Sequence, residues 1–375
     1  MKILATAAAA FSLRLLAAGA QNQEIIDLLN SRAAGDFARY EQSAAKVAAA
    51  AERGAPLQQF IIALCSRDDA NPPAAARVPP ETRERYFAES RPALESVAAR
   101  SSNPLVLYLL AVDRKDSQMM LRAAELGNPQ AMNRVASAIV SANPLPYPDS
   151  ASSAELARAF GFFRQAARSG DVNGLYNYGV CLSSGIGTER DPEAAFNAFR
   201  TAAESGHVEA MNNLGFCFRE GIHVRRNLPM SAYWFRRAAE AGSPVGMLNF
   251  GWALKRGEGT DKDVRAGAKY VYKAAKAGDP DAICAWAMML LSGDGVGKDP
   301  ASAVAFLEKA AAAGCVPAMR SLQRCYATGE GVDVSMREAT LWKMRADAAG
   351  GDAVAAEWLA REDVPAKAGA QKGNN

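Results

Sequence analysis

A short motif rich in alanine and closed by glycine recurs every 36 residues through the second half of the chain. Five equal steps indicate internal repeats, which constrain the fold more than any other feature of the sequence. A unit of 36 residues that ends in glycine has room for two helices and two turns. The closing glycines are Gly170, Gly206, Gly242, Gly278, Gly314 and Gly350.

The first part of each repeat has the spacing of an amphipathic helix. We number positions from the preceding closing glycine, so that position one is the residue after it. Small residues stand at position four and large apolar residues at positions eight and twelve, which share one face of a helix. The residues at position eight are Tyr178, Leu214, Phe250, Trp286 and Leu322. This spacing predicts a first helix in every repeat.

The loop that follows carries turn chemistry. Position fifteen is Gly185, Gly221, Gly257, Gly293 and Gly329, and glycine there predicts a left-handed helix end. Six residues later stand Asp191, Asn227, Asp263, Asp299 and Ser335, all of them types that cap a helix N-terminus. A phosphate-binding loop would follow a strand and would not recur in every repeat. The Gly-x-Gly loops, such as that of Gly185 and Gly187, are therefore predicted to be turns.

A second helix follows, with an aromatic residue near its middle and an Ala-Ala pair near its end. Together these features resemble the Sel1-like repeat, a relative of the tetratricopeptide repeat. The stretch AMNNLGFCFREGIHVRRNLPMSAYWFRRAAEAG, from Ala210 to Gly242, matches nearly end to end, and the clear match covers 170–350. His223 and Gln323 depart from the expected glycines. The resemblance implies an all-α, right-handed α-solenoid of 36-residue helix-turn-helix repeats that acts as a non-catalytic scaffold for other proteins, often in bacterial envelope or secretion complexes.

The N-terminus has the layout of a secretory signal. Lys2 precedes an apolar run from Ile3 to Leu13 and a small-x-small site that ends at Ala20. We expect residues 1–20 to be a signal peptide cleaved after Ala20, and the protein to be periplasmic or secreted. Arg14 interrupts the apolar stretch, so an amphipathic first helix in a cytoplasmic protein is the alternative. No later apolar run approaches the ~20 residues of a membrane span.

The remaining boundaries follow from where the repeat pattern holds. We expect a helical N-terminal region over 21–102 and degenerate repeats over 103–169, interrupted by a Pro/Ser-rich insertion at 141–153. Five full repeats occupy 170–350, a capping helix 351–360 and a disordered tail 361–375. The sequence assigns no repeat to residues 21–102.

The concave face of a solenoid is lined by first helices, and it is the predicted binding groove. The apolar stripe fixes which positions lie opposite the core. Asparagine at position seven can hold an extended peptide through its amide. The predicted groove residues are Asn177, Asn213 and Asn249 at position seven, Tyr176 and Asn212 at position six, Val180, Phe216, Trp252 and Met288 at position ten, and the basic Arg219 and Arg256. The alternative is that these residues pack within the protein.

The net charge of the chain and its distribution indicate which class of partner to expect. With 43 Lys and Arg against 40 Asp and Glu, the net charge of +3 is too small for a general nucleic-acid binder. Between His207 and Gly278 there are twelve Lys and Arg against six Asp and Glu, an excess that can steer an acidic protein segment. A solvated helix surface explains the same excess. We therefore expect a protein or peptide partner, with acidic character as one option, and no nucleic acid.

The sequence gives little support for disulfide bonds, metal binding or catalysis. Six cysteines lack a regular pairing pattern, and first helices stacked about 8–10 Å apart would hold equivalent cysteines too far apart to bridge. We expect buried thiols at Cys65, Cys181, Cys217, Cys284, Cys315 and Cys325. Two histidines without partnered ligands suggest no metal, no cofactor and no catalytic residues. The rival functions are a carbohydrate or cell-wall binder that uses Phe216 and Trp252, and an enzyme hosted by the N-terminal region.

Overall fold

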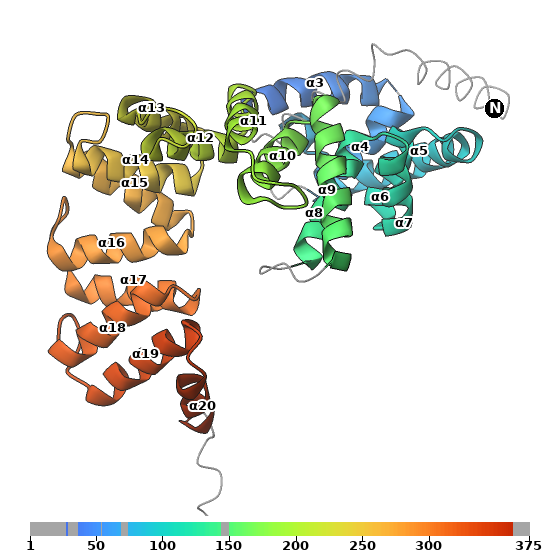
Figure 1. Cartoon of the computed structure of the whole chain (residues 1–375). Coiled ribbons are helices and arrows are strands. Elements are labelled where there is room, and N and C mark those ends of the chain that lie inside the picture. Colours follow the sequence, from blue (N-terminus) through green and yellow to red (C-terminus); the bar gives the residue numbers. More distant parts are fainter. Residues whose placement is uncertain (1–27, 29–36, 54, 69–73, 144–149, 363–375) are drawn as a thin grey trace, which may run out of the picture. The chain divides into compact units, whose positions relative to one another are not determined.

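The structure is a computed structural model that describes residue 28 and residues 37–53, 55–68, 74–143 and 150–362. Every regular element in these ranges is a helix, which confirms the predicted all-α class of consecutive helix pairs. The chain divides into two compact units, Met1–Arg226 and Asn227–Asn375, here called unit 1 and unit 2 (Figure 1). The predicted signal peptide, and all of the predicted tail after residue 362, lie outside the described residues.

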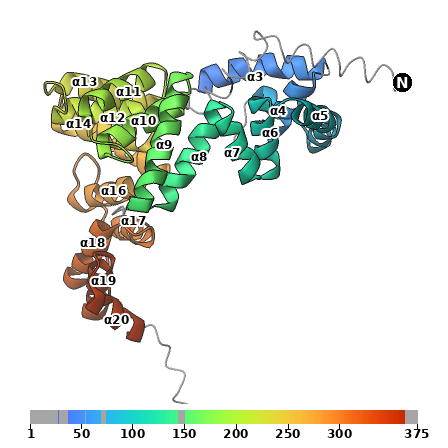
Figure 2. The same ribbon diagram turned by 45° about the vertical axis from the view of Figure 1, so that its right-hand side comes forward.

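Unit 1 contains ten α-helices in its described part and one short 3₁₀ helix, η1 (Ala74–Ala76). The α-helices are α3 (Phe37–Glu52), α4 (Pro56–Asp68), α5 (Pro80–Arg100), α6 (Pro104–Arg114), α7 (Ser117–Glu125), α8 (Pro129–Ala142), α9 (Ser150–Arg168), α10 (Val172–Ser184), α11 (Pro192–Glu204) and α12 (Val208–Glu220). Neighbours in sequence pack against each other, as the pairs α4/α5 and α8/α9 show in both views (Figures 1 and 2).

Unit 2 contains eight α-helices in its described part. They are α13 (Leu228–Glu240), α14 (Pro244–Arg256), α15 (Val264–Lys276), α16 (Pro280–Ser292), α17 (Pro300–Ala312), α18 (Val316–Thr328), α19 (Met336–Ala349) and α20 (Ala353–Glu362). The first helices of the repeats are α10, α12, α14, α16 and α18, and the helix after each is its second helix.

The turns between first and second helices form as the sequence predicts. All five glycines at position fifteen cap their first helix in the left-handed conformation, with φ between 71° for Gly257 and 78° for Gly329. All five predicted N-cap side chains accept a hydrogen bond from the backbone N–H three residues on, for example Asp263 from Ala266 over 2.8 Å. These caps satisfy backbone groups that a helix end otherwise leaves unpaired. The Gly-x-Gly loops are turns.

A glycine pair sets how closely two helices approach in unit 2. A Cβ atom added to Gly267 in α15 would lie 2.6 Å from the backbone oxygen of Gly251 in α14, closer than any real contact. Gly251 stands at position nine of its repeat, next to the apolar residue at position eight. The close approach lets the apolar faces of α14 and α15 meet without a gap.

The N-terminal region of unit 1 has its own apolar core. Phe60 of α4 meets Phe87 of α5 edge to face, with ring centroids 5.4 Å apart. Ile61, Leu109 and Met132 are fully buried in the same cluster, so α4, α5, α6 and α8 share one core. The sequence assigned no repeat to residues 21–102. The described part of this range contains the helices α3, α4 and α5.

Candidate interaction face on the first helices

The structure places every predicted groove residue on a first helix. Unit 1 holds Tyr176, Asn177 and Val180 on α10 and Asn212, Asn213, Phe216 and Arg219 on α12. Unit 2 holds Asn249, Trp252 and Arg256 on α14 and Met288 on α16. Phe216, Arg256 and Met288 are exposed, and the others are half-buried. We call these residues the first-helix face and describe it separately in each unit.

Polar side chains in unit 1 connect one first helix to the next. The amide nitrogen of Asn177 donates to the side-chain oxygen of Asn133 on α8 over 2.8 Å. Asn213 hydrogen-bonds to the hydroxyl of Tyr176 on α10. In both cases a residue at position seven reaches back to position six of the preceding helix pair, since Asn133 is the sixth residue after Gly127. Part of the asparagine row therefore holds neighbouring repeats together.

Asn133 is the contact that the sequence analysis missed. It lies in the degenerate repeat, whose spacing is 43 residues from Gly127 to Gly170 because of the insertion at 141–153. Numbering that repeat from Gly127 places an asparagine at position six and would have revealed the partner of Asn177.

His207 is a buried N-cap that contacts the same face. Its Nδ1 accepts the N–H of Ala210 over 3.2 Å, so the ring proton is on Nε2, which donates to the side-chain oxygen of Asn173 over 3.0 Å. The imidazole ring also stacks on Tyr176, with centroids 4.3 Å apart. Burial lowers the pKa of His207 to about 4, against a smaller opposing effect of Glu209. The ring is therefore neutral at physiological pH.

Phe216 is the most exposed aromatic side chain of the face in unit 1. It is 42% exposed, and the guanidinium of Arg219, one turn later on α12, lies 5.0 Å from its ring centroid. Arg219 is also held by Glu220, with its Nε 2.8 Å from the carboxylate. The exposed ring and the cation at its side are groups that a partner could contact.

Unit 2 presents a related arrangement on α14. The ring of Trp252 has the ammonium of Lys255 4.7 Å and the guanidinium of Arg256 5.3 Å from its centroid. Lys255 also pairs with Asp294, across 2.6 Å, in the loop after α16. Trp252 is half-buried and packs against the buried cluster of Ala268, Val271 and Met289. Its ring is therefore partly covered, whereas the ring of Phe216 is open.

In unit 2, the first helix α16 also presents an exposed apolar side chain. Met288 on α16 is 37% exposed. Its sulfur accepts a hydrogen bond from the hydroxyl of Ser321 on α18 over 3.3 Å, so α16 and α18 present one continuous surface at this point. Methionine is flexible and polarisable, which suits a surface that adapts to a partner.

The cysteines are all buried, as predicted. Burial raises the pKa of Cys181 and of Cys284 to about 12 and that of Cys217 to about 11. Among the described residues, no group of His, Cys, Asp or Glu side chains is arranged to hold a metal ion. Within the same ranges, every helix is too short or too polar to cross a membrane.

Known proteins share the repeat. The family model described as Sel1 repeat matches residues 153–171, 172–207, 208–243, 244–279 and 280–315. The crystal structure of a Sel1 repeat protein from Oxalobacter formigenes is similar, with 25% identity and a TM-score of 0.57 over 66% of this chain and 97% of that one. No curated protein matches the chain.

A second solved structure shows the same fold. It is c5321, a protective antigen of uropathogenic Escherichia coli strains that displays an SLR fold. Its identity is 24% and its TM-score 0.55, over 84% of this chain and 66% of that one. The helix pair α18 and α19 follows the last matched repeat, with Gly329 as the C-cap of α18 and Ser335 as the N-cap of α19.

Proposed function

The chain is a Sel1 repeat protein, with repeats across residues 153–315, and we propose that it is a scaffold that binds extended segments of another protein through the first-helix face of each unit. Proteins built from Sel1 repeats generally mediate protein–protein interactions and are typically non-catalytic. The repeat family therefore supports a protein partner, and the side chains of the face support the mode of binding.

The single observation that carries the proposal is the exposure of Phe216 and Met288 on first helices. Their side chains are 42% and 37% exposed, although the rest of each helix follows the apolar pattern of a packed repeat. Exposed apolar groups beside cations, such as Phe216 beside Arg219, are the composition of protein-binding surfaces. Each would contribute to binding by leaving water when a partner segment docks.

The hydrogen-bonding capacity of the asparagine side chains supports an extended peptide backbone as the ligand. A side-chain amide has two N–H donors and a carbonyl acceptor. The hydrogen bonds of Asn177 to Asn133 and of Asn213 to Tyr176 use part of this capacity and fix the two amides in position. Fixed amides cost less entropy when they bind the peptide groups of a partner. This arrangement recognises a backbone without reading its sequence.

The charge of the face favours carboxylates on the partner to a limited degree. Lys255 is paired with Asp294, and Arg219 with Glu220. Arg256 has an exposed guanidinium that lies 3.7 Å from Glu258, so a partner carboxylate can compete for it. We infer a partner segment with apolar side chains and scattered acidic residues rather than a strongly acidic one.

A sugar ligand is the second candidate because Phe216 is 42% exposed, although the guanidinium of Arg219 lies 5.0 Å from its ring centroid. The other aromatic residue of the face fits less well. Lys255 and Arg256 lie against the ring of Trp252, and a cation in that place occupies the surface on which a sugar would stack. A protein segment is therefore the better ligand for the face as a whole.

We propose that the scaffold acts outside the cytoplasm. The support is the layout of residues 1–20, with Lys2, the apolar run and the small residues before Gln21. N-terminal sequencing of the protein purified from its native host tests this. A mature chain that begins at Gln21 supports export, and one that begins at Met1 or Lys2 contradicts it.

Site-specific photo-cross-linking tests the binding mode. A photoreactive phenylalanine analogue replaces Phe216 or Met288, with exposed second-helix positions Arg200 and Lys269 as controls. We expect a discrete protein adduct at Phe216 and Met288 and none at the controls. Adducts at the second-helix positions alone would contradict the proposed face, and a glycan that blocks the adduct would favour the sugar.

A further inference from the structure

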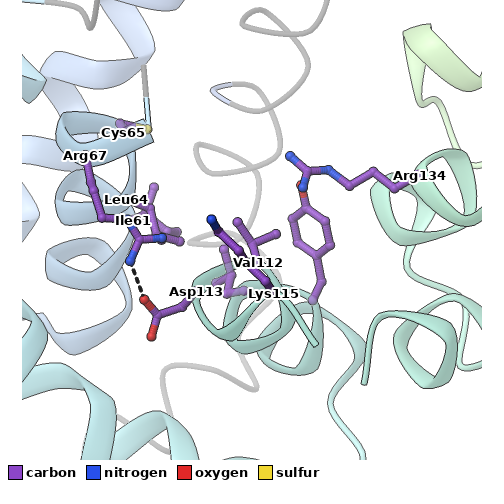
Figure 3. A pocket seen from close by; sticks show the side chains of 10 residues that line it. Ile61, Leu64, Cys65, Arg67, Val112, Asp113, Lys115 and Arg134 are labelled. Carbon is purple, nitrogen blue, oxygen red and sulfur yellow. Dashed lines mark hydrogen bonds and ion pairs between the residues drawn. The ribbon is translucent and has the colours of Figure 1, made fainter. Parts of the chain in front are cut away.

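A cavity of about 590 Å³ lies in unit 1 among α4, α6 and α8 (Figure 3). Its volume falls within the range of roughly 300–1,000 Å³ that is usual for small-molecule sites. The sequence analysis predicted none of its residues as functional, and it is separate from the first-helix face. It is lined by Ile61, Leu64, Cys65, Arg67, Tyr108, Leu109, Val112, Asp113, Lys115 and Arg134.

One part of the cavity is apolar. Ile61 and Leu64 of α4 face Leu109 and Val112 of α6, and the ring of Tyr108 extends this surface. Ile61, Leu64, Leu109 and Tyr108 are at most 6% exposed, and Val112 is half-buried, so a ligand would reach this part mainly at Val112.

The other part of the cavity carries three cations. Figure 3 shows the charged ends of Arg67, Lys115 and Arg134 directed toward the same space. Arg67 pairs with Asp113 across 2.6 Å, and Arg91 from α5 pairs with the same carboxylate across 2.8 Å. Burial alone would raise the pKa of Asp113, but hydrogen bonds from Arg91 and Arg67 outweigh it and lower that pKa. Asp113 is therefore an anion that already has two partners.

Lys115 and Arg134 remain as charges without a counterion among the described residues. The guanidinium of Arg134 lies 5.7 Å from the ring centroid of Tyr108, a contact that leaves its charge unneutralised. The ammonium of Lys115 forms no ion pair with any described residue. Both side chains are exposed, and an anion placed between them would be attracted by both charges.

The backbone of Lys115 points to the same conclusion. Lys115 caps α6 in the left-handed conformation, with φ 56°. The five first helices of the repeats have glycine at the equivalent place, where it avoids a penalty of roughly 1 kcal/mol. A lysine therefore stands at a place where glycine is less strained, and its side chain lines the cavity.

We propose that this cavity binds a small molecule that carries a single carboxylate on an apolar or aromatic body. The body would lie against Val112 at the edge of the apolar part, and the carboxylate would pair with the exposed side chains of Lys115 and Arg134. A guanidinium matches a carboxylate with two parallel hydrogen bonds. Asp113 is already paired with Arg67 and Arg91, which leaves Lys115 and Arg134 as the cations that would pair with the ligand.

Isothermal titration calorimetry on the full chain tests the proposal, with 4-phenylbutyrate as the probe. The matched neutral probe is 4-phenylbutanol, and inorganic phosphate is the probe without an apolar body. We expect 4-phenylbutyrate to bind at least about tenfold more tightly than either, as one charge-assisted hydrogen bond is enough to produce that ratio.

Two variants separate binding from folding. Lys115→Gly removes the charge and relieves the left-handed backbone, so it should weaken 4-phenylbutyrate about tenfold without lowering the unfolding temperature. Arg134→Gln should weaken it to a similar degree. The control is Arg114→Ala, since Arg114 pairs with Glu95 and does not line the cavity. This variant should bind 4-phenylbutyrate with the affinity of the wild type.

Several results would overturn the proposal. One is a wild-type chain that does not bind 4-phenylbutyrate, and another is equal binding of the acid and the alcohol. Inorganic phosphate that binds as tightly as the acid would show that the apolar surface is not used. Equal affinities of the wild type and the Lys115→Gly variant would show that the lysine does not contact the ligand.

Discussion

The imidazole ring of His207 stacks on the phenol ring of Tyr176, with centroids 4.3 Å apart and ring planes 20° apart. His207 caps α12, and Tyr176 belongs to α10, so the pair joins two successive repeats. Tyr176 in turn hydrogen-bonds to Asn213 of the first-helix face. The protonation state of one buried ring thus bears on both the stability of unit 1 and the position of a proposed binding residue.

We predict that His207 titrates near pH 4. Its burial lowers the pKa from 6.5 to about 4, because the charged ring would lose water and the hydrogen bond that Nδ1 accepts. The chain has two histidines, so an NMR titration shows two imidazole signals, and His207→Asn identifies one by its loss. A His207 signal that titrates near 6.5 would contradict the buried, neutral ring.

The same shift makes unit 1 sensitive to acid. The folded pKa lies below the unfolded one, so the contribution is fully present above pH 6.5 and is lost as the pH falls toward 4. Between pH 7 and pH 5 the wild type should lose about 2 kcal/mol more free energy of unfolding than His207→Asn, which keeps a capping side chain. Asp171, whose burial raises its pKa to about 6, acts in the opposite direction but is present in both proteins. Urea unfolding at the two pH values measures the difference, and parallel losses would contradict it.

Replacing glycine by alanine should change the stability in opposite directions at two sites, Gly267 in unit 2 and Gly161 in unit 1. Gly267→Ala places a Cβ 2.6 Å from the oxygen of Gly251, so α14 and α15 must separate. We expect a loss of roughly 1–3 kcal/mol in stability. Gly161 in α9 has nothing within 4 Å of an added Cβ, and Gly161→Ala should stabilise by about 0.5–1 kcal/mol. Thermal unfolding followed by circular dichroism distinguishes the two, and equal effects would show that the glycine contact is not tight.

Buried thiols should be unreactive while the protein is folded. Raising the pKa of Cys181 from 9.0 to about 12 lowers its thiolate fraction near pH 8 about a thousandfold. Titration with a disulfide reagent should therefore detect almost no thiol in the native protein and six after denaturation. Fewer than six in the denatured, unreduced protein would indicate a disulfide bond and contradict the buried thiols.

The repeated half of the fold could be predicted because every repeat has the same types of cap residue at the same positions. Glycine at position fifteen and a capping residue at position twenty-one fix the helix ends in every copy, and the structure has them where the sequence places them. One copy alone, with His223 in place of the second loop glycine, would have been weaker evidence. The structure holds His223 at φ 62°, so the repeat imposes the turn even without glycine.

The candidate sites were less predictable because they depend on contacts between helices. The spacing placed Asn177 and Phe216 on the face opposite the core, but both residues have the same helical position whether they bind a partner or a neighbour. Only the structure shows that Asn177 donates to Asn133 and that Phe216 is open. The cavity at Lys115 could not be predicted, since its walls come from three helices, one in the region without an assigned repeat and two in the degenerate repeats.

The measurement that tests the central claim most directly is the affinity of the cross-linked partner for two double variants of the full chain. Phe216→Ala with Met288→Ala removes the exposed apolar side chains of the first helices, and Tyr233→Ala with Tyr272→Ala removes equally exposed ones, 38% and 39%, from second helices. We predict that the first pair weakens binding at least about tenfold and that the second leaves it within about twofold. The reverse result, or equal losses in both, would contradict a binding face on the first helices.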